Sequence, residues 1–329
     1  MKDVNGDTFV RNTFDELMED VLYELLYDPQ FVCSPRGSEV KELIVPRLVL
    51  TNPRNRLLTS ERRNANYGFA VGEFLWYWRG SNSLEEMTYY NKRMPNFSDD
   101  GKTLNSAYGH IMKGKGNGEF GINQWKFAIE TLHNDTDSRR AILQIHHPEH
   151  QSMAYRVGSK DVPCTLSLQF FIRDNELHLH TNMRSNDVMW GLTYDLFSFT
   201  LFQECMLLDL KRHWPEAFKD LELGRYYHTA GSLHLYERHY KMAEKMYEEY
   251  TIRLDKWARN WSSSSPYFTE PMIPIDDINE LERLCISEAA LRTGDIDEID
   301  VGSFFGAVGW MAEQLNAHRR KRDEEQDKR

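Results

Sequence analysis

Residues Val162–Asp195 read VPCTLSLQFFIRDNELHLHTNMRSNDVMWGLTYD, and this stretch decides the fold. Apolar and polar residues alternate over Leu166–Ile172, which predicts a strand with one buried face. An Asp-Asn pair favours a tight turn, after which Leu177–Met183 returns as a second strand. The hairpin is expected to bring Cys164 and Arg184 to the same end of a sheet, a nucleophile beside an anion-binding segment.

The composition is that of a globular protein. The 329 residues are 40% hydrophobic and 12% aromatic, enough for one large domain or two ordinary ones. The net charge of −11 argues against nucleic acid as a bulk partner, because phosphate binding normally requires a basic face. A small anionic substrate stays open, since a few clustered arginines suffice for it.

The cysteines make a zinc site or a disulfide framework improbable. Cys33, Cys164, Cys205 and Cys285 lie far apart and form no C-x-x-C pair. No apolar run reaches the roughly 20 residues of a membrane span, and the first residues lack a signal-peptide core. A cytoplasmic protein is expected.

The first third predicts two helices and an interrupted strand. Residues 13–27 have helical apolar spacing after Asn12 as the cap. Residues 43–50 form a β-branched run broken by Pro46. Residues 67–80 are apolar nearly all round, which predicts a buried helix ending at glycine. Glu73 is its only acid, and such a carboxylate usually has a function or a partner.

Several side chains are predicted to lie in loops. Residues 104–109 are interpreted as a turn presenting Tyr108, and the turn at residues 34–37 offers Arg36 to an anion. A helix over residues 121–133 leads to Arg139 and Arg140 at the mouth of a strand. Paired arginines there can fork onto a phosphate, or they can be two solvated surface cations.

Two segments resemble ligand sites without matching them. The glycines between residues 114 and 121 lack the G-K-[ST] of a phosphate loop, so they predict a flexible loop. His146, His147 and His150 surround Pro148, which is expected to prevent helical spacing of the histidines. They are interpreted as loop histidines, and no metal is predicted.

The second half is predicted to be mainly helical. A long apolar helix over residues 193–212 contains Asp195 near its start. A single strand over residues 228–236 places His234 and Tyr236 on one face. Further helices are expected at residues 240–261, 276–292 and 303–319, with a linker at residues 262–265. This pattern divides the chain into a catalytic domain, residues 1–261, and a helical extension, residues 262–329, packed on the same domain.

Six segments in register resemble the thymidylate synthase superfamily, and more closely its phage deoxycytidylate hydroxymethylase branch. They run in the family's order, from the helix with Glu73 to the strand with His234: E-F-L-W-Y-W-R-G, S-A-Y-G, D-S-R-R, P-C-T-x-x-x-Q-F-F-I-R-D, N-M-R-S-N-D-V-x-x-G and G-S-L-H-L-Y-x-R-H. Each segment is weak alone, but the set is specific and covers about residues 36–240.

The resemblance implies an α/β (α+β) fold around a mainly antiparallel, kinked sheet flanked by helices, and a homodimer formed through the sheet. It implies that Arg139 and Arg140 reach the neighbouring subunit's site, where they join Arg36, Arg184 and Ser185 on the nucleotide phosphate. The two active sites of the dimer would then be shared.

The resemblance also assigns the chemistry. Cys164 matches the nucleophile that adds to C6 of the pyrimidine, so that C5 can attack methylenetetrahydrofolate, the co-substrate. Glu73 matches the glutamate that organises water near the base and folate, and Tyr108 the tyrosine that helps remove the C5 proton. The remaining matches are His234 and Tyr236 for the sugar hydroxyl, Asp187 for folate, and Asn186 and Gly191 beside the substrate.

Asp195 stands where thymidylate synthases carry asparagine. An amide can donate to uracil O4 and accept from N3–H, whereas a carboxylate only accepts. Cytosine offers an N4 amino donor and, when protonated, an N3–H donor. The carboxylate therefore favours cytosine.

The exocyclic methylene at C5 can accept hydride, giving methyl, or water, giving hydroxymethyl. Thr165 stands where synthases usually have histidine, which favours water capture. The leading hypothesis is a dCMP 5-hydroxymethylase, in the host cytoplasm if the chain is phage-encoded. A CMP hydroxymethylase, a thymidylate synthase, a dUMP hydroxymethylase and a catalytically silent nucleotide-binding module remain alternatives.

Overall fold

The computed structural model describes residues 8–114, 122–260 and 271–328. The predicted glycine loop, apart from its first residue, and the predicted linker at residues 262–265 lie outside the described residues. The chain forms two compact units, described separately below. The first unit comprises Met1–Ala65, Ile172–Gln203 and Glu222–Met272, and the second comprises Asn66–Phe171, Glu204–Leu221 and Ile273–Arg329.

The first unit contains a sheet in which four strands run in the order β1-β4-β9-β7. Their bounds are β1 Thr8–Arg11, β4 Arg47–Leu50, β9 Glu222–Ala230 and β7 Glu176–Met183. β4 pairs antiparallel with β9, whereas β1–β4 and β7–β9 are parallel pairs, so the sheet is mixed. A register shift on β7 between Leu177 and Leu179 marks an irregularity against β9.

The turn before β7 confirms the predicted hairpin connection. Asp174 and Asn175 both have positive φ, 50° and 61°, the left-handed backbone that a two-residue hairpin turn requires. The strand before this turn is β6, Thr165–Arg173, and the boundary between the two units falls within it.

A second sheet in this unit has the strand order β2-β3-β10-β8. Its strands are β2 Phe31–Cys33, β3 Val40–Ile44, β10 Ser232–Tyr236 and β8 Asn186–Asp187. The interruption predicted at Pro46 is confirmed, because β3 and β4 belong to different sheets.

The single strand predicted over residues 228–236 is wrong. β9 ends at Ala230, β10 begins at Ser232, and the two strands belong to different sheets. Gly231 lies between them, where an added Cβ would approach the carbonyl oxygen of Arg184 to 2.8 Å. Glycine lets the chain pass from one sheet to the other at this close approach.

Helix α1, Phe14–Tyr27, is confirmed, but its cap is Thr13 and not Asn12. The Thr13 hydroxyl accepts from the backbone N–H of Glu16 at 3.2 Å, and the Glu16 carboxylate accepts in return from the backbone N–H of Thr13 at 2.9 Å. The backbone N–H of Asn12 also donates to the Glu16 carboxylate, at 3.1 Å, but the Asn12 side-chain oxygen accepts from the Thr51 hydroxyl at 3.2 Å and does not cap the helix.

Two further helices carry residues of the first unit. Helix α7, Gly191–His213, begins two residues before the predicted start, so Asp195 lies inside it and not at its opening. Helix α9 spans Tyr240–Asn260. Buried residues of this unit include Phe14, Leu22, Leu50, Leu179, Phe197, Tyr226, Leu235 and Tyr250.

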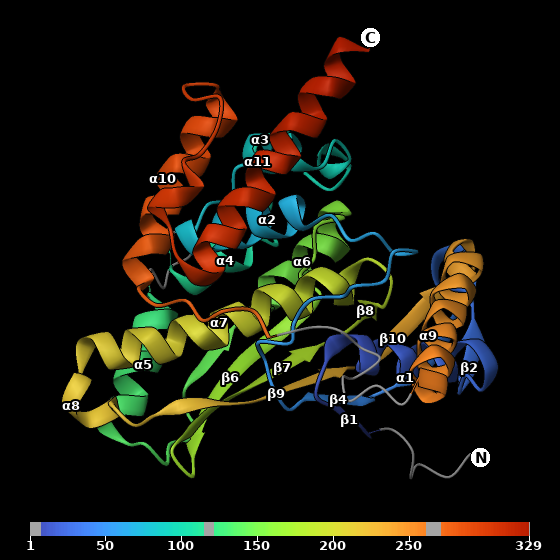
Figure 1. Ribbon diagram of the computed structural model, residues 1–329, viewed down its shortest axis with the longest axis horizontal. Helices are drawn as coiled ribbons and strands as arrows, with labels where there is room; N and C mark the ends of the chain where they lie inside the picture. Colours follow the sequence, from blue (N-terminus) through green and yellow to red (C-terminus); the bar gives the residue numbers. More distant parts are fainter. Residues whose placement is uncertain (1–7, 115–121, 261–270, 329) are drawn as a thin grey trace. The chain divides into compact units, whose positions relative to one another are not determined.

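The second unit is mostly helical. Its longer helices are α2 Tyr67–Arg79, α3 Leu84–Tyr90, α5 Gln124–Asn134, α6 Pro148–Val157, α10 Ile278–Thr293 and α11 Gly306–Asp327. Shorter elements are α4 Tyr108–Met112, α8 Pro215–Phe218 and the strand β5 Ile142–Gln144, which pairs antiparallel with β6. Helices α10 and α11 lie next to α2 (Figure 1).

Two predictions in this unit need correction. The buried helix ending at Gly80 is confirmed, with Gly80 left-handed at φ 65°. The predicted segment does contain a turn, at residues 105–106, but Tyr108 itself begins a short helix and is buried. His147 precedes and His150 lies within α6, because Pro148 takes the first helical position, where its missing N–H costs nothing.

The fold class is confirmed: helices pack with mixed sheets in an α/β arrangement. Among the described residues, no helix combines the length and apolar character that crossing a membrane would need.

Candidate active site

Helix α2 links two of the predicted catalytic residues. Glu73 is partly exposed, and Tyr77 lies one helical turn further along the same face. The ring of Tyr77 stacks on the ring of Tyr108, with centroids 5.1 Å apart and planes inclined by 11°. The helix that carries Glu73 therefore also orients Tyr108.

Gly109 makes this arrangement possible. A Cβ at this position would overlap the backbone of Tyr77. Helix α4 can therefore approach α2 only because residue 109 is glycine. The S-A-Y-G motif combines a tyrosine with the glycine that lets it stack.

The segment before Cys164 is tied to the segment before Tyr108. The buried carboxylate of Asp161 accepts from the backbone N–H of Ser106 at 3.1 Å. Burial raises the pKa of Asp161, and the hydrogen bonds from Ser106 oppose that shift. Cys164, which is partly exposed, follows Asp161 by three residues, so the second unit holds Cys164, Tyr108 and Glu73 on connected segments.

Thr165 follows the nucleophile at the start of β6 and is fully buried. Its hydroxyl oxygen has no hydrogen-bond partner among the described residues. A buried hydroxyl without a protein partner is a site that ordered water commonly satisfies.

In the first unit, Asn186 holds the carboxyl group of Asp195. Asn186 is buried, and its Nδ2 donates to Asp195 Oδ2 at 2.7 Å. Gly191 leaves the space for this contact, since an added Cβ would lie 2.8 Å from Asn186 Nδ2. Three predicted substrate-binding positions are thus in mutual contact.

Burial raises the pKa of Asp195 to about 7, and the hydrogen bond from Asn186 lowers it in part. Near neutral pH this group therefore populates both its carboxylate and its acid form. The acid form carries an O–H donor, so the premise that residue 195 only accepts hydrogen bonds is incomplete. A buried Tyr226 adds to the polar interior of this unit and shares a hydrogen bond of 2.9 Å with His228.

Asp187 and His234 are register partners in the parallel pair β8–β10. The backbone N–H of Met189 donates to Asp187 Oδ1 at 2.9 Å, which fixes the carboxylate. Burial lowers the pKa of His234, opposed by the charge of Asp187. The rings of His234 and Tyr236 meet edge to face at 4.9 Å, which confirms that they share one side of the strand.

The predicted phosphate ligands have exposed or partly exposed side chains. Arg184 and Ser185 follow β7, and the backbone N–H of Ser232 donates to the carbonyl oxygen of Arg184 at 3.2 Å. Arg36 is exposed at a turn with φ 54°.

Arg139 and Arg140 belong to the second unit and have exposed side chains. Their backbones are fixed: Gln169 Nε2 donates to the carbonyl oxygen of Arg139 at 2.9 Å, and the backbone N–H of Arg140 donates to Ser138 Oγ at 3.2 Å. The two guanidinium groups are therefore presented from a fixed loop before β5.

Sequence reasoning missed Arg63. This arginine is buried, donates through Nε to the carbonyl oxygen of Met189 at 2.6 Å, and lies over the Trp190 ring at 4.2 Å. Trp190 Nε1 donates in turn to His239 at 2.7 Å. Arg63 Nη2 is buried without a hydrogen-bond partner among the described residues, so it can still donate to a ligand or to ordered water. The R-R pair at residues 62–63 gave no periodic signal, so only packing reveals which of the two is buried.

Among the described residues there is no cluster of three or more histidine, cysteine, aspartate or glutamate side chains that could hold a metal ion. His150 is partly buried, and burial together with the neighbouring histidines lowers its pKa to about 4. The backbone N–H of His147 donates to His150 Nδ1 at 3.0 Å. The local role of His150 is thus to cap α6.

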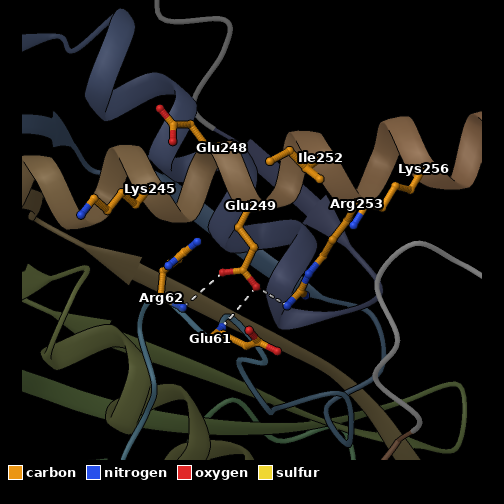
Figure 2. A pocket seen from close by; sticks show the side chains of 8 residues that line it. All are labelled: Glu61, Arg62, Lys245, Glu248, Glu249, Ile252, Arg253 and Lys256. Carbon is orange, nitrogen blue, oxygen red and sulfur yellow. Dashed lines mark hydrogen bonds and ion pairs between the residues drawn. The ribbon is translucent and has the colours of Figure 1, made fainter.

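A separate cavity of about 580 Å³ lies along α9 (Figure 2) and contains none of the predicted site residues. Glu249 points towards the chain at residues 61–62 and accepts from the backbone N–H groups of Glu61 and Arg62, each at 3.2 Å. Arg253 binds the same carboxylate and the Thr59 hydroxyl. These contacts hold α9 against the loop at residues 59–62.

Comparison with known proteins gives the family. The thymidylate synthase family model matches residues 44–260, well over half of the chain. The chain belongs to the thymidylate synthase family. This match contains Cys164, Glu73, Tyr108 and Asp195, whereas α10 and α11 lie outside it.

Individual relatives include two phage proteins named deoxyuridylate hydroxymethyltransferase. The Bacillus phage SP01 protein is 30% identical over 256 residues, 75% of this chain and 64% of the relative. The Delftia phage PhiW-14 protein is 35% identical over 166 residues, 48% of this chain and 44% of the relative. The chain thus matches less than two thirds of the length of these two relatives. Thymidylate synthase 1 of Bacillus spizizenii is 25% identical over 241 residues, 69% of this chain and 79% of that protein.

Proposed function

We propose that this protein transfers a one-carbon unit from 5,10-methylenetetrahydrofolate to C5 of dCMP and captures water to give 5-hydroxymethyl-dCMP. The observation that carries the proposal is the hydrogen bond from the buried Asn186 to the part-buried Asp195, which stands at the position where synthases carry asparagine. Family membership supports the folate-dependent transfer, and the phage hydroxymethyltransferases among the relatives support the hydroxymethyl product.

The chemistry begins at Cys164. Its thiolate adds to C6 of the pyrimidine, and the electron pair of the C5–C6 double bond becomes available at C5. C5 then bonds to the methylene carbon of the folate co-substrate as one of that carbon's two bonds to nitrogen breaks. Loss of the C5 proton later breaks the other bond, which expels tetrahydrofolate and leaves an exocyclic methylene at C5. In this proposal Tyr108 removes the C5 proton and Glu73 orders water. The stacking of Tyr108 on Tyr77, which belongs to the same helix as Glu73, supports these roles. Addition of water to the exocyclic methylene and loss of Cys164 complete the hydroxymethyl group.

Asp195 selects the base in this proposal. Asn186 donates to Asp195 Oδ2, so Asp195 Oδ1 is the oxygen that accepts a hydrogen bond from the base. Cytosine presents an N4 amino donor beside N3, and a carboxylate that accepts from protonated N3–H also makes C6 more electrophilic. Asn186 fixes the rotamer that makes this contact.

The remaining residues bind the other parts of the substrates. Arg36, Arg184 and Ser185 take the phosphate together with Arg139 and Arg140 of a second subunit, which makes the active enzyme a homodimer. His234 and Tyr236 bind the sugar hydroxyl, while Asp187 and Glu73 contact folate. Arg63 donates to the carbonyl oxygen of Met189, whose backbone N–H donates to Asp187. The buried guanidinium of Arg63 can therefore bind a carboxylate of the folate glutamyl group beside Asp187. Residues 1–261 would form the catalytic domain, with residues 262–329 packed on it.

A second candidate is dUMP hydroxymethylation, which two observations favour. The phage relatives carry that name, and a pKa of about 7 makes the acid form of Asp195 available. The acid can donate to uracil O4 as asparagine does.

One experiment separates these readings. The protein is incubated with methylenetetrahydrofolate and with dCMP, CMP or dUMP in turn, and nucleotide mass and dihydrofolate absorbance are followed. Hydroxymethyl-dCMP without dihydrofolate is the expected result. Hydroxymethyl-dUMP would select the second candidate, and a methylated product with dihydrofolate would identify a thymidylate synthase. Absence of any product from the wild type, with Cys164→Ala as the matched blank, would favour a silent nucleotide-binding module.

A further inference from the structure

A buried ionic cluster joins the C-terminal helices to the helix that carries Glu73. Glu288 of α10 has a fully buried side chain that accepts three hydrogen bonds. Arg79 Nη1 donates to its Oε2 at 2.6 Å, while Tyr90 OH and Arg292 Nε donate to its Oε1 at 2.6 and 3.0 Å. Both carboxylate oxygens are therefore satisfied within the protein.

A second carboxylate completes the charge balance. Glu86 of α3 accepts from Arg79 Nη2 at 2.6 Å and from Ser81 Oγ at 2.8 Å, and it lies 3.8 Å from Arg292. Two guanidinium groups thus face two carboxylates. Removal of one member would leave a buried charge without its partner, so the geometry of the cluster is strongly constrained.

Close backbone packing adds a second attachment to α2. An added Cβ at Gly68 would overlap His318 of α11, and one at Gly72 would overlap the ring of Tyr90. The two glycines are one helical turn apart and form a smooth face on α2. Tyr90 fills part of this face and also donates to Glu288, so packing and the ionic cluster converge on the same helix.

Helix α2 is thereby held at its C-terminal end and along one face. Arg79 is its last residue, followed by the left-handed Gly80. The same helix carries Glu73, and its Tyr77 orients Tyr108. The helix is 13 residues long and hydrogen-bonded throughout, so a change at Arg79 is transmitted to Glu73 less than two turns away.

We propose that Glu288 is a positioning residue for catalysis. The C-terminal helices outside the family match hold α2 so that Glu73 and Tyr108 stay correctly positioned relative to each other. This inference rests on the proposed function, since it assigns Glu288 an effect on the step that Glu73 serves. Glu288 does not touch the substrate in this scheme. Its effect passes through Arg79 and α2.

The test compares Glu288→Gln with Glu298→Gln, a matched control. Glu298 also belongs to the C-terminal segment and pairs with Arg320 at 2.8 Å, but both side chains are largely exposed. Rates are measured well below the melting temperature of each variant, which circular dichroism provides. Release of tritium from C5 of labelled nucleotide reports proton removal, and product mass reports the complete reaction.

We expect Glu288→Gln to lower kcat and C5 tritium release about tenfold, with the KM for nucleotide nearly unchanged, because misplacement of a catalytic group mainly affects the transition state. Glu298→Gln should behave as the wild type. In a Glu73→Gln background, Glu288→Gln should cost little more, since both changes affect the same step.

Tyr90→Phe provides a milder variant that keeps the ring and removes one hydrogen bond to Glu288. It should lower kcat about threefold and serves if Glu288→Gln does not fold. The inference is overturned if these variants lower only the melting temperature, or if their effect on kcat is fully retained in the Glu73→Gln background. An active wild type with unchanged variants overturns the inference alone, whereas an inactive wild type overturns the proposed function with it.

Discussion

Asn186 Nδ2 lies 2.7 Å from Asp195 Oδ2, so a buried amide holds the one side chain whose chemistry separates cytosine from uracil in the proposed site. The two residues are nine positions apart and lie on different elements, β8 and α7. Their contact fixes which carboxyl oxygen is free for a base.

Asp195→Asn is expected to move the preference towards dUMP. An asparagine can donate to O4 and accept from N3–H of uracil, whereas cytosine would meet a donor with its own amino group. Leaving buried polar groups unpaired costs about 1–3 kcal/mol, so the ratio of kcat/KM for dCMP over dUMP should fall roughly 5- to 150-fold. An unchanged ratio would contradict base selection by Asp195.

The same variant should change the dependence of stability on pH. Burial raises the pKa of Asp195 from 3.8 to about 7, so the folded state holds this proton more tightly than the unfolded state. Ionisation therefore lowers the free energy of unfolding as pH rises from about 4 to about 7. Asp195→Asn removes this loss, so its free energy of unfolding relative to wild type should increase across that window. Urea unfolding at pH 4.5 and 8 measures the difference, and a pH-independent difference would refute the raised pKa.

Thr165→Val tests whether the unpaired buried hydroxyl holds the water used in the reaction. Valine has nearly the same shape, but it removes the polar atom. The yield of hydroxymethyl nucleotide should fall several-fold while tritium release from C5 continues, because proton removal precedes water capture. Equal losses in both measurements would assign Thr165 to an earlier step or to packing.

Arg63→Gln should weaken folate binding. In the part of the chain that the structure describes, one nitrogen of the buried guanidinium has no partner, and glutamine removes the charge while keeping a polar group. The KM for methylenetetrahydrofolate should rise about tenfold, consistent with loss of a charge-assisted hydrogen bond of about 1.5–3 kcal/mol, and the KM for nucleotide should change little. Arg62→Gln is the matched control, because Arg62 is exposed. A rise confined to the nucleotide KM would place Arg63 at the phosphate instead.

The proposed sharing of active sites between two subunits predicts complementation between inactive variants. Arg140→Ala removes an arginine that the subunit supplies to its neighbour's active site. Cys164→Ala removes the nucleophile from the subunit's own active site. Mixing and refolding the two together should restore activity in those dimers that combine an intact Cys164 with an intact partner Arg140. Full activity from a preparation shown by light scattering to be monomeric would contradict the shared site.

The local sequence pattern was sufficient to predict an element wherever that element depends mainly on its own residues. The apolar run before Gly80 predicted α2, and the Asp-Asn pair predicted the turn before β7. Both signals come from neighbouring residues: a glycine that ends a helix, and two residues that tolerate positive φ. The same reasoning failed at residues 228–236. Strand propensity continues through Gly231, but the approach of Arg184, distant in sequence, ends one strand and starts another.

The candidate site divides in the same way. The amino-acid sequence by itself determined the residue types and their order, including Cys164 directly after proline and Asp195 four residues after Gly191, and hence the family and the kind of chemistry. Only the tertiary structure decided that Asn186 binds Asp195, that Arg63 is buried while Arg62 is exposed, and that Glu288 binds Arg79 across 209 positions of sequence. The physical reason is that burial and charge pairing depend on neighbours that the fold brings together, and no periodicity along the chain records them.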